Sequence, residues 1–314
     1  MSINWFPGHM VAASDKAKQA LAEHDVVIEV LDARCPGASA NPSIERMRMS
    51  RQRPALKVLN KADIADPAVT REWLAYFNGL KNTSAIALSC KKPGEAPKAL
   101  AAARKLAPHR NKDDDYLKPL RLLIMGVPNV GKSTLINALL KKKSAKTGDE
   151  PAITKVLHRY DLGPGLWLTD TPGLMWPRIK YPSDGLMLAA SHMIGSNAYY
   201  ESEAAIYLAD LLLERYPQAL ADRYKVDPMA AAGTDHPLDG ITLIETIAGK
   251  RGYRLKGGEP DFDKACIALL GDYRGGMLGR ISLETPNSRA AMLAQGEAVE
   301  EPGDALPPEE VGEA

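Results

Sequence analysis

Short apolar runs alternate with longer helical patterns over the first half of the chain. The runs are rich in Val, Ile and Leu, and each has about the length of a buried strand. They occupy residues 26–31, 55–59, 85–88, 122–125 and 166–168. Helical patterns fill residues 9–23, 43–53, 67–79 and 96–106. This alternation predicts an α/β domain.

The pattern changes after Leu174. No further Val- or Ile-rich run follows, and the apolar residues take up helical spacing instead. The expected helices cover residues 183–195, 201–216, 218–224, 241–251 and 261–272. We therefore expect the α/β domain to span residues 1–178 and a smaller, all-helical domain to span residues 179–289. Residues 290–314 carry seven acidic residues, several prolines and no Lys or Arg, which predicts a disordered acidic tail.

Composition argues against several classes of protein. Hydrophobic residues make up 45% and charged residues 25% of the chain, as in ordinary globular proteins. Three scattered cysteines give no disulfide framework and indicate a reducing compartment. No apolar run approaches the length of a membrane span and no targeting segment is recognisable, so we expect a cytoplasmic protein without a membrane partner. The net charge is +1, but it is +8 outside the acidic tail, which permits contact with nucleic-acid backbones without requiring it.

The run at residues 122–125 opens into a glycine loop and then a helical pattern. The loop, GVPNVGKST at residues 126–134, fits the P-loop, whose backbone N–H groups surround phosphate oxygens. Lys132 supplies a positive charge to the terminal phosphates, and the Ser133 hydroxyl can ligate Mg²⁺. The helix N-terminus adds a partial positive charge. The expected nucleotide-binding residues of this loop are Pro128, Asn129, Val130, Gly131, Lys132, Ser133 and Thr134.

Three other strand ends indicate that the nucleotide is GTP or GDP. Residues 60–63 read NKAD, and the Asp63 carboxylate can accept hydrogen bonds from N1–H and the 2-amino group of guanine, whereas adenine would leave it unpaired. Residues 89–91, SCK, resemble a second guanine loop, and residues 170–173, DTPG, fit the element that senses Mg²⁺ and the γ-phosphate. The candidate residues are Asn60, Lys61, Asp63, Ser89, Cys90, Lys91, Asp170 and Gly173.

The order of these motifs is unusual. In ordinary GTPases the P-loop comes first and the guanine motifs come last, whereas here NKAD and SCK precede the P-loop. All of the motifs must still converge on one nucleotide, so the sequence predicts a circularly permuted P-loop GTPase domain. Chain termini that lie close together make such a permutation tolerable.

The motif WFPGHM at residues 5–10 completes a family resemblance. Together with the permuted motif order and the stretch LGDYRGGMLGRISLE at residues 270–284, it resembles the ribosome biogenesis GTPase A family, also called YlqF, which has Mtg-type mitochondrial relatives. The resemblance covers residues 1–284. It implies a GTP-hydrolysing assembly factor for the large ribosomal subunit. It also implies rRNA and ribosomal proteins as partners. We expect the free chain to be a monomer.

The Mg²⁺ ligands are expected to be Ser133, Asp170 and Thr154. Thr154 fits the switch threonine that ligates Mg²⁺ when the γ-phosphate is present. It stands in a Pro-x-x-Thr context that the competing Thr147 lacks. Ala152 stands where the family usually has Gly, which leaves the backbone path of this switch open.

Catalysis is expected to depend on Lys132, Gly173, Thr154 and a replacement for a missing side chain. Leu174 stands where many GTPases place a water-orienting glutamine, so the chain alone should hydrolyse GTP slowly. By resemblance, Asn129 can ligate K⁺ between the phosphates, and His9 can position the attacking water. The resemblance also implies that the large subunit and K⁺ stimulate turnover.

Two other functions stay open at this point. The chain could be a slow GTP-binding scaffold, which Leu174 favours and the intact set of Lys132, Ser133, Thr154 and Asp170 opposes. It could also be a GTPase associated with RNA modification, although no additional catalytic constellation supports this.

Two segments outside the nucleotide motifs also allow two interpretations each. Asp32 and Arg34 are expected to form a structural pair at the edge of the nucleotide site rather than a catalytic one. Residues 250–254, KRGYR, are either an RNA-contacting turn or an ordinary solvated one.

Overall fold

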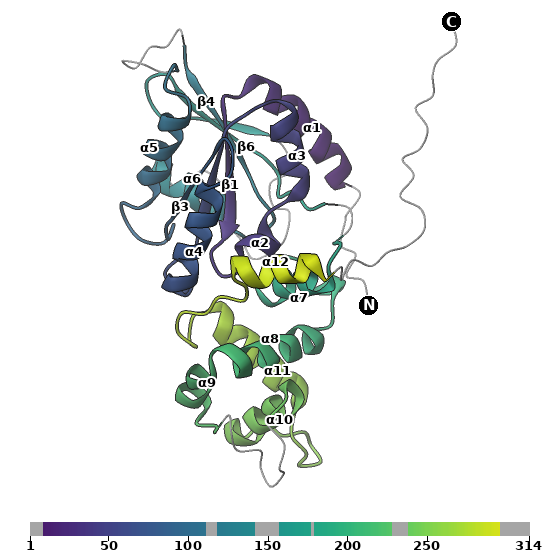
Figure 1. Cartoon of the computed structure of the whole chain (residues 1–314). Coiled ribbons are helices and arrows are strands. Elements are labelled where there is room, and N and C mark those ends of the chain that lie inside the picture. Colours follow the sequence, from purple (N-terminus) through teal and green to yellow (C-terminus); the bar gives the residue numbers. More distant parts are fainter. Residues whose placement is uncertain (1–8, 111–117, 142–156, 177–178, 228–237, 296–314) are drawn as a thin grey trace, which may run out of the picture.

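A six-stranded sheet forms the centre of the larger domain in the computed structural model (Figure 1). The structure describes residues 9–110, 118–141, 157–176, 179–227 and 238–295. The strand order is β3-β2-β1-β4-β6-β5, and every neighbouring pair is parallel except β5 and β6. The strands are β1 (Val26–Asp32), β2 (Ala55–Asn60), β3 (Thr83–Ala87), β4 (Leu120–Met125), β5 (His158–Asp161) and β6 (Leu166–Asp170).

Helices cover the two faces of this sheet because successive strand residues point to opposite sides. On one face, Val27 and Leu123 pack with α1 and α3, and Leu31 packs with α4. On the other face, Ile28 and Leu122 belong to the cluster that includes α5 and α6. The helices of this domain are α1 (His9–Glu23), α2 (Pro36–Ser39), α3 (Pro42–Ser50), α4 (Pro67–Asn78), α5 (Ala96–Leu106) and α6 (Lys132–Leu140).

The first strand, β1, lies in the middle of the sheet, and later strands extend the sheet on both sides of it. From β1 the chain passes to β2 and then to the β3 edge, and it returns to β4 on the other side of β1. The strand order therefore reverses between β1 and β4. In open α/β sheets, ligands bind outside the carboxyl ends of the strands at such a switch point. The strand ends that carry NKAD, SCK, GVPNVGKST and DTPG all lie at this edge.

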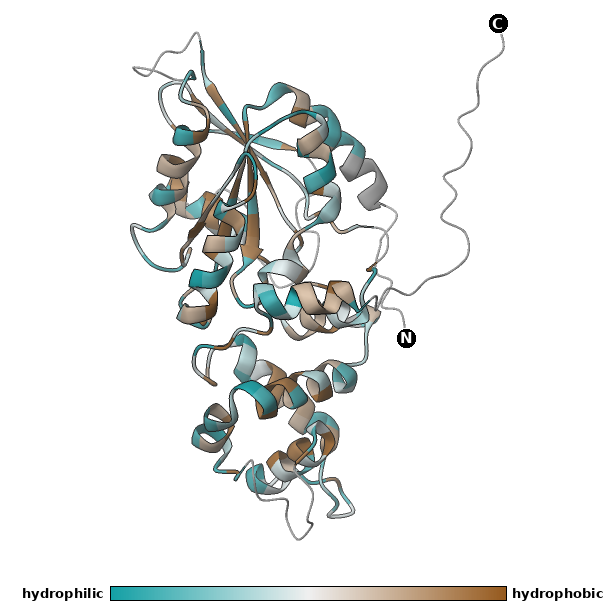
Figure 2. Cartoon of the chain, in the orientation of Figure 1, coloured by the Kyte–Doolittle hydropathy of each residue, from teal (hydrophilic) through white to brown (hydrophobic). Residues whose placement is uncertain are grey.

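The second half of the chain is helical, as the change of pattern after Leu174 predicted. Its helices are α7 (Pro182–Ala190), α8 (Glu201–Arg215), α9 (Pro217–Tyr224), α10 (Gly240–Arg251), α11 (Phe262–Arg274) and α12 (Pro286–Ala294), with the 3-10 turn η2 (Ser196–Ala198). One buried cluster runs from the α5 side of the sheet through α7 to α8 and α11. Figure 2 shows apolar residues concentrated on the strands and on the helix faces that pack together. The helical part is thus joined to the sheet by continuous apolar packing.

Four elements differ from the expectations. The short helix α2 follows β1 at a place where no helix was expected. Strand β5 was not expected, because its sequence HRYD has no apolar run. Helix α7 ends at Ala190 rather than at residue 195, because His192 takes a left-handed conformation with φ of 62°. Helix α12 was also not expected, and it carries regular structure to Ala294, five residues into the segment expected to be a disordered tail. The rest of that segment, residues 296–314, lies outside the described residues.

The stretch before α12 folds back onto the α/β domain. The Leu283 N–H donates to the Arg34 carbonyl at 2.6 Å, and the Ala38 N–H donates to Glu284 Oε1 at 2.7 Å. Trp73 Nε1 donates to the Glu284 carbonyl at 3.1 Å. The helical part is therefore tied to the sheet at both of its ends. Among the described residues, no helix is long and apolar enough to cross a membrane.

Candidate nucleotide-binding site

The phosphate loop connects β4 to α6 through three residues of positive φ. Gly126, Asn129 and Gly131 have φ of 147°, 56° and 104°. A Cβ at Gly126 would lie 2.6 Å from the Val30 carbonyl oxygen, and one at Gly131 would clash with the Asn60 amide. Glycine is required at both positions because the loop passes so close to its neighbours. Helix α6 begins directly afterwards at Lys132, so its N-terminus faces the loop.

Lys132 lies over this loop. Its Nζ donates to the carbonyls of Gly126 and Val127, both at 3.0 Å. Burial lowers the pKa of Lys132 to about 8, although the charge of Asp170 acts in the opposite direction. A buried ammonium group with little counter-charge is a strong site for a phosphate anion. Ser133 and Thr134 follow in the first turn of α6, and both are half-buried.

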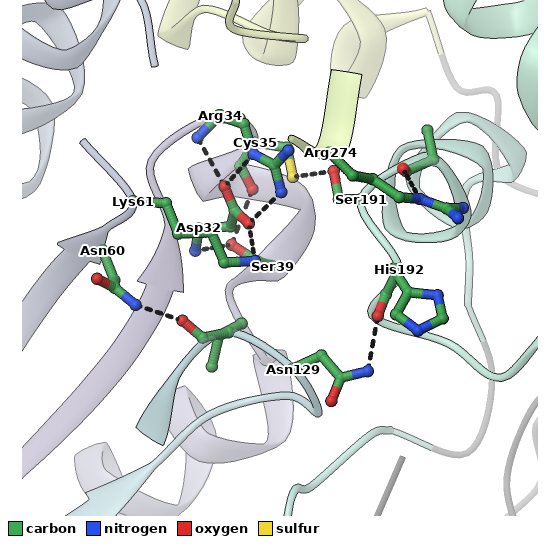
Figure 3. A network of polar contacts seen from close by, with 12 residues as sticks. Asp32, Arg34, Cys35, Ser39, Asn60, Lys61, Asn129, Ser191, His192 and Arg274 are labelled. Carbon is green, nitrogen blue, oxygen red and sulfur yellow. Dashed lines mark hydrogen bonds and ion pairs between the residues drawn. The ribbon is translucent and has the colours of Figure 1, made fainter. Parts of the chain in front are cut away.

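Asn60 joins the guanine motifs to the phosphate loop. Its Nδ2 donates to the Val130 carbonyl at 2.8 Å (Figure 3). Its Oδ1 accepts from the Cys90 N–H at 3.0 Å. One side chain thus ties together the ends of β2, β3 and β4. The motif NKAD is placed against the P-loop, as a shared nucleotide site requires.

The two guanine loops also meet through their backbones. The Ala62 N–H donates to the Leu88 carbonyl at 3.2 Å, which places Asp63 beside the SCK loop. Ser89 and Cys90 are buried, and Lys91 is exposed. Burial raises the pKa of the Cys90 thiol to about 12, so this cysteine is a neutral packing residue in place of the usual alanine.

Lys61 binds a carboxylate at the end of β1. Its Nζ lies 2.8 Å from Asp32 Oδ2, and Arg34 donates to the same carboxylate through Nε at 2.9 Å and through a terminal nitrogen at 2.8 Å (Figure 3). Burial alone would raise the pKa of Asp32, but Arg34 and Lys61 hold it below its usual range. The expected pairing of Asp32 with Arg34 is confirmed. The contact of Lys61 was not foreseen.

The DTPG segment lies against the phosphate loop. Asp170 is buried at the end of β6, next to β4, and the Thr171 hydroxyl donates to the Ile124 carbonyl at 2.9 Å. The Leu174 N–H donates to the Gly126 carbonyl at 3.2 Å, and a Cβ at Gly173 would lie 3.1 Å from Pro128. Any residue larger than glycine at position 173 would press on the loop.

Leu174 is not directed at the nucleotide site. Its side chain is buried in a cluster with Ala17 and Leu21 of α1 and with Ile44 of α3. The position expected to lack a water-orienting group is therefore part of the hydrophobic core under α1. The sequence could not reveal this, because a residue that directly follows DTPG can point its side chain either toward the nucleotide or into the core.

Asn129 contacts the helical part of the chain. Its Nδ2 donates to the His192 carbonyl at 2.8 Å, just after the end of α7 (Figure 3). Arg274 of α11 donates to the carbonyls of Ala190 and Ala189 at 2.9 and 3.0 Å, which holds the same turn from the other side. Sequence reasoning missed the roles of His192 and Arg274. No motif marks His192, and the stretch at residues 270–284 contains Arg274 without indicating its contact with the turn after α7.

Two expected catalytic residues are not placed. Thr154 lies outside the described residues, as does the competing Thr147. His9 is the first residue of α1, but its side chain is not described.

The donor set fits Mg²⁺ held with phosphates. The hydroxyl of Ser133 and the carboxylate of Asp170 are the hard oxygen donors that Mg²⁺ prefers. Within the described residues, no group of three or more His, Cys, Asp or Glu could hold a metal. Magnesium bound by one or two protein oxygens and substrate phosphates needs no such cluster.

The basic turn at residues 250–254 is partly neutralised. Arg251 pairs with Asp272 at 3.3 Å, and Lys250 donates to the Lys225 carbonyl at 2.9 Å. Lys264 lies over the Tyr253 ring, 4.8 Å from its centroid. These contacts account for the turn as surface structure, and they leave its role in RNA contact a prediction.

Comparison with known proteins gives consistent matches. The family model described as "50S ribosome-binding GTPase" matches residues 121–226, which begin at the P-loop strand and exclude the guanine motifs. Ribosome biogenesis GTPase A of Bacillus cereus is 38% identical over 306 residues, covering 96% of this chain and 100% of that protein. Mitochondrial ribosome-associated GTPase 1 of Xenopus tropicalis is 30% identical, covering 90% of this chain and 94% of that protein.

Solved structures agree with these matches. The GNP-bound YlqF of Thermotoga maritima has a TM-score of 0.59 and 27% identity, covering 88% of this chain and 99% of that one. A GDP-bound YlqF structure has the same TM-score, with 26% identity. The fold is thus a circularly permuted GTPase domain followed by helices. With relatives above 30% identity along nearly their whole length and with all four nucleotide motifs at one edge of the sheet, this chain belongs to the ribosome biogenesis GTPase A family.

Proposed function

We propose that this protein hydrolyses GTP during maturation of the large ribosomal subunit and that the bound nucleotide controls its affinity for the pre-ribosomal particle. The observation that carries the proposal is the position of Asn60, which joins both guanine loops to the phosphate loop in a permuted chain. The names of the relatives, which refer to ribosome biogenesis and ribosome association, support the choice of partner. We expect rRNA and ribosomal proteins to form the binding surface, and the free protein to be a cytoplasmic monomer.

The described residues support the nucleotide chemistry step by step. Asp63 would accept the guanine N1–H and 2-amino protons, and Lys132 would pair with the terminal phosphates in place of its two carbonyl partners. Ser133 and Asp170 would hold Mg²⁺, which neutralises charge on the phosphates. A γ-phosphate that orders Thr154 and Gly173 would then act on the segment that leads into the helical part.

Slow turnover without a partner is part of the proposal. The Leu174 side chain is buried in the core, and thus no group at this position orients water. We propose that K⁺ held by Asn129 and a water positioned by His9 replace this group when the large subunit binds. Acid–base help or positioning by a histidine contributes roughly 10²–10⁴-fold to a rate.

The experiment that tests the proposal measures GTP turnover by the full chain. Rates are compared with and without purified large ribosomal subunits, in K⁺ and in Na⁺ at equal ionic strength. The proposal expects slow hydrolysis alone and faster hydrolysis with subunits in K⁺. Equal affinity for ATP and GTP, or turnover that subunits leave unchanged, would contradict it.

His9→Ala provides the sharper variant. It should keep GTP binding and subunit binding but lose most of the stimulated turnover. Single-turnover rates with saturating subunits separate this from a packing role, in which His9→Ala would lower stability and leave the stimulated rate per folded molecule unchanged.

A further inference from the structure

A groove of about 410 Å³ lies away from the nucleotide motifs, between α1 and the β4–β6–β5 side of the sheet. Its wall is one face of α1, and its floor is formed by residues of β4, β6 and β5 together with Leu157, which precedes β5. The lining residues are Lys16, Gln19, Ala20, Glu23, His24, Arg121, Leu157, Arg159, Trp167 and Thr169. None of the nucleotide-binding residues predicted from the sequence contributes to it.

Strand register explains why its basic and aromatic side chains share one face. Arg121 of β4 is the register partner of Trp167 of β6, and Arg159 of β5 is the partner of Thr169. Because side chains alternate along a strand, these four residues point to the same side of the sheet. This is the side that α1 covers further along, over Val27 and Leu123 of the core. The floor therefore continues the core face, but with Arg, Trp and Thr in place of aliphatic residues.

Two guanidinium groups are held on the indole of Trp167. The Arg159 guanidinium lies 4.5 Å from a ring centroid of Trp167, and that of Arg121 lies 5.6 Å away. Both arginines are exposed, and Trp167 is half-buried. Among the described residues, no carboxylate lies within ion-pair distance of either arginine. Within the described residues, the Arg121 guanidinium makes one hydrogen bond, at 3.4 Å, to the Glu23 carbonyl, while the Arg121 main-chain N–H donates to Asp25 Oδ2 at 2.9 Å. Cation–π contacts thus position the two charges and leave most of their N–H donors available.

The α1 wall of the groove contributes a third cation, Lys16, and a buried histidine, His24, that joins α1 to β6. Lys16, Gln19 and Glu23 follow one another at helical spacing along the exposed face of α1. His24 is buried, and its Nδ1 lies 2.5 Å from the Ala20 carbonyl while its Nε2 lies 2.7 Å from the Thr169 hydroxyl. Because a carbonyl can only accept, Nδ1 carries the proton, and burial lowers the pKa of His24. The neutral ring accepts from Thr169 and fastens the end of α1 to β6.

The charge of the groove is one-sided. Lys16, Arg121 and Arg159 contribute three positive charges against the single carboxylate of Glu23, and His24 is neutral. Guanidinium groups fixed on an aromatic plane suit phosphate oxygens, which they can bind with two parallel hydrogen bonds. The basic turn at residues 250–254 is a weaker candidate because Asp272 already pairs with Arg251.

We infer that this groove binds the phosphate backbone of rRNA on the large ribosomal subunit, with Arg121 and Arg159 as its principal contacts. The inference rests on the proposed function for its partner. It assigns to the α/β domain a contact surface separate from the nucleotide site and from the helical part.

The test compares Arg121→Gln/Arg159→Gln with a matched control, Arg71→Gln/Lys105→Gln. The control also removes two exposed charges, from α4 and α5, outside the groove. Affinity for purified large subunits is measured by co-sedimentation at several salt concentrations. The groove variant should bind roughly tenfold more weakly than the control, and the slope of log affinity against log salt should fall by about 1 to 2. Equal GDP affinity in all three proteins verifies that the nucleotide site is intact.

Distinct results overturn the inference and the proposed function. If the wild type binds subunits but the groove variant matches the control in affinity and in slope, the groove inference is wrong and the proposed function stands. If the wild type does not bind subunits, the proposed function is wrong, and the groove inference that rests on it is wrong as well. A second arm uses protein-free rRNA from the large subunit. A groove variant that loses subunit binding but binds this RNA as tightly as the wild type shows that the groove contacts ribosomal protein, which also overturns the inference.

Discussion

Lys132 shows how a functional charge can reduce the stability of the protein that carries it. Its folded-state pKa of about 8 lies below the ordinary value of 10.5, because burial disfavours the ammonium form. The cost of burying the charge is therefore fully present below pH 8, and it declines as the pH rises from 8 to 10.5. Bound phosphate would supply the counter-charge, so the free energy that burial of the ammonium group costs would be regained when the nucleotide binds.

Replacing this lysine tests the argument. Lys132→Met keeps most of the aliphatic stem and removes the charge, so we expect the nucleotide-free protein to be more stable at pH 7 by about 1–3 kcal/mol. This advantage should shrink between pH 8 and 10.5, and GDP with Mg²⁺ should no longer stabilise the variant. Denaturant unfolding across this pH range, with and without nucleotide, measures both effects. Lys105→Met, on the exposed face of α5, is the control. A nucleotide-free Lys132→Met protein less stable than the wild type would contradict the expectation.

Asp63 is predicted to select guanine, which is again a property of a single residue. Asp63→Asn replaces an acceptor by a donor opposite N1–H and the 2-amino group of guanine. GDP affinity should therefore fall by roughly two orders of magnitude, since the charged acceptor of N1–H becomes a neutral one, the hydrogen bond to the 2-amino group is lost and two donors oppose each other there. Xanthosine diphosphate presents a carbonyl in place of the amino group, so it should bind the variant better than GDP does. Competition with a fluorescent nucleotide gives both affinities, and unchanged preference for GDP would remove Asp63 from base recognition.

At the scale of elements, Leu174 belongs to the packing of α1 rather than to the chemistry of water. It is buried with Ala17, Leu21 and Ile44, and the side chain of Asn41 donates to its carbonyl at 2.8 Å. A change in the position of the DTPG segment would thus alter the packing of α1, the helix that begins at His9. We therefore expect this packing to transmit a change in the DTPG segment to α1.

Leu174→Gln separates the two interpretations of this position. If the side chain stays in the core, glutamine buries an amide and loses apolar contacts, which costs about 2–4 kcal/mol. Intrinsic GTP hydrolysis should not rise, because the amide does not reach the nucleotide. Urea unfolding and single-turnover hydrolysis provide the two measurements. Faster intrinsic hydrolysis in the variant would show that the side chain can turn toward the phosphates.

Local pattern predicted the elements better than it predicted their contacts. Five of the six strands were predicted because each contains an apolar run. Four of them lie inside the sheet, and β3 is a half-buried edge strand, whereas the polar edge strand β5 has no such run. The motif residues were found because phosphate and guanine chemistry demands particular residue types at fixed spacing. Arg34 and Tyr273 could not be paired in advance, since they are 239 residues apart and no spacing rule links the turn after β1 to the stretch at residues 270–284.

Over the whole molecule, the nucleotide site and the helical part share polar contacts as well as apolar packing. Lys61 of NKAD binds Asp32, which binds Arg34 (Figure 3). The Arg34 guanidinium lies 4.5 Å from the centroid of the Tyr273 ring in α11. Asn129 of the P-loop contacts the turn after α7. A change at the nucleotide therefore has two direct routes into the helices. The permuted order makes this possible, because the DTPG segment leads into the helical part without an intervening strand.

The potassium prediction concerns Asn129, which contacts the turn after α7. Asn129 uses its Nδ2 for the His192 carbonyl, and its Oδ1 is the atom that suits a cation. A K⁺ ion at this position would neutralise charge between the phosphates as the bond to the leaving group breaks. We expect hydrolysis in K⁺ to exceed that in Na⁺ by roughly tenfold or more at equal ionic strength. Asn129→Ala should remove the difference without abolishing GDP binding.

The control for this prediction depends on which atom Asn129 contacts. Since the acceptor is the main-chain carbonyl of His192, His192→Asn keeps it, and asparagine tolerates the positive φ of that residue. His192→Asn should thus retain the preference for K⁺ that Asn129→Ala loses. Turnover is measured for the three proteins in each salt with saturating large subunits. Equal wild-type rates in K⁺ and Na⁺ would reject a potassium site. A preference for K⁺ that survives in Asn129→Ala would place the ion elsewhere and reduce Asn129 to a contact between the P-loop and the helices.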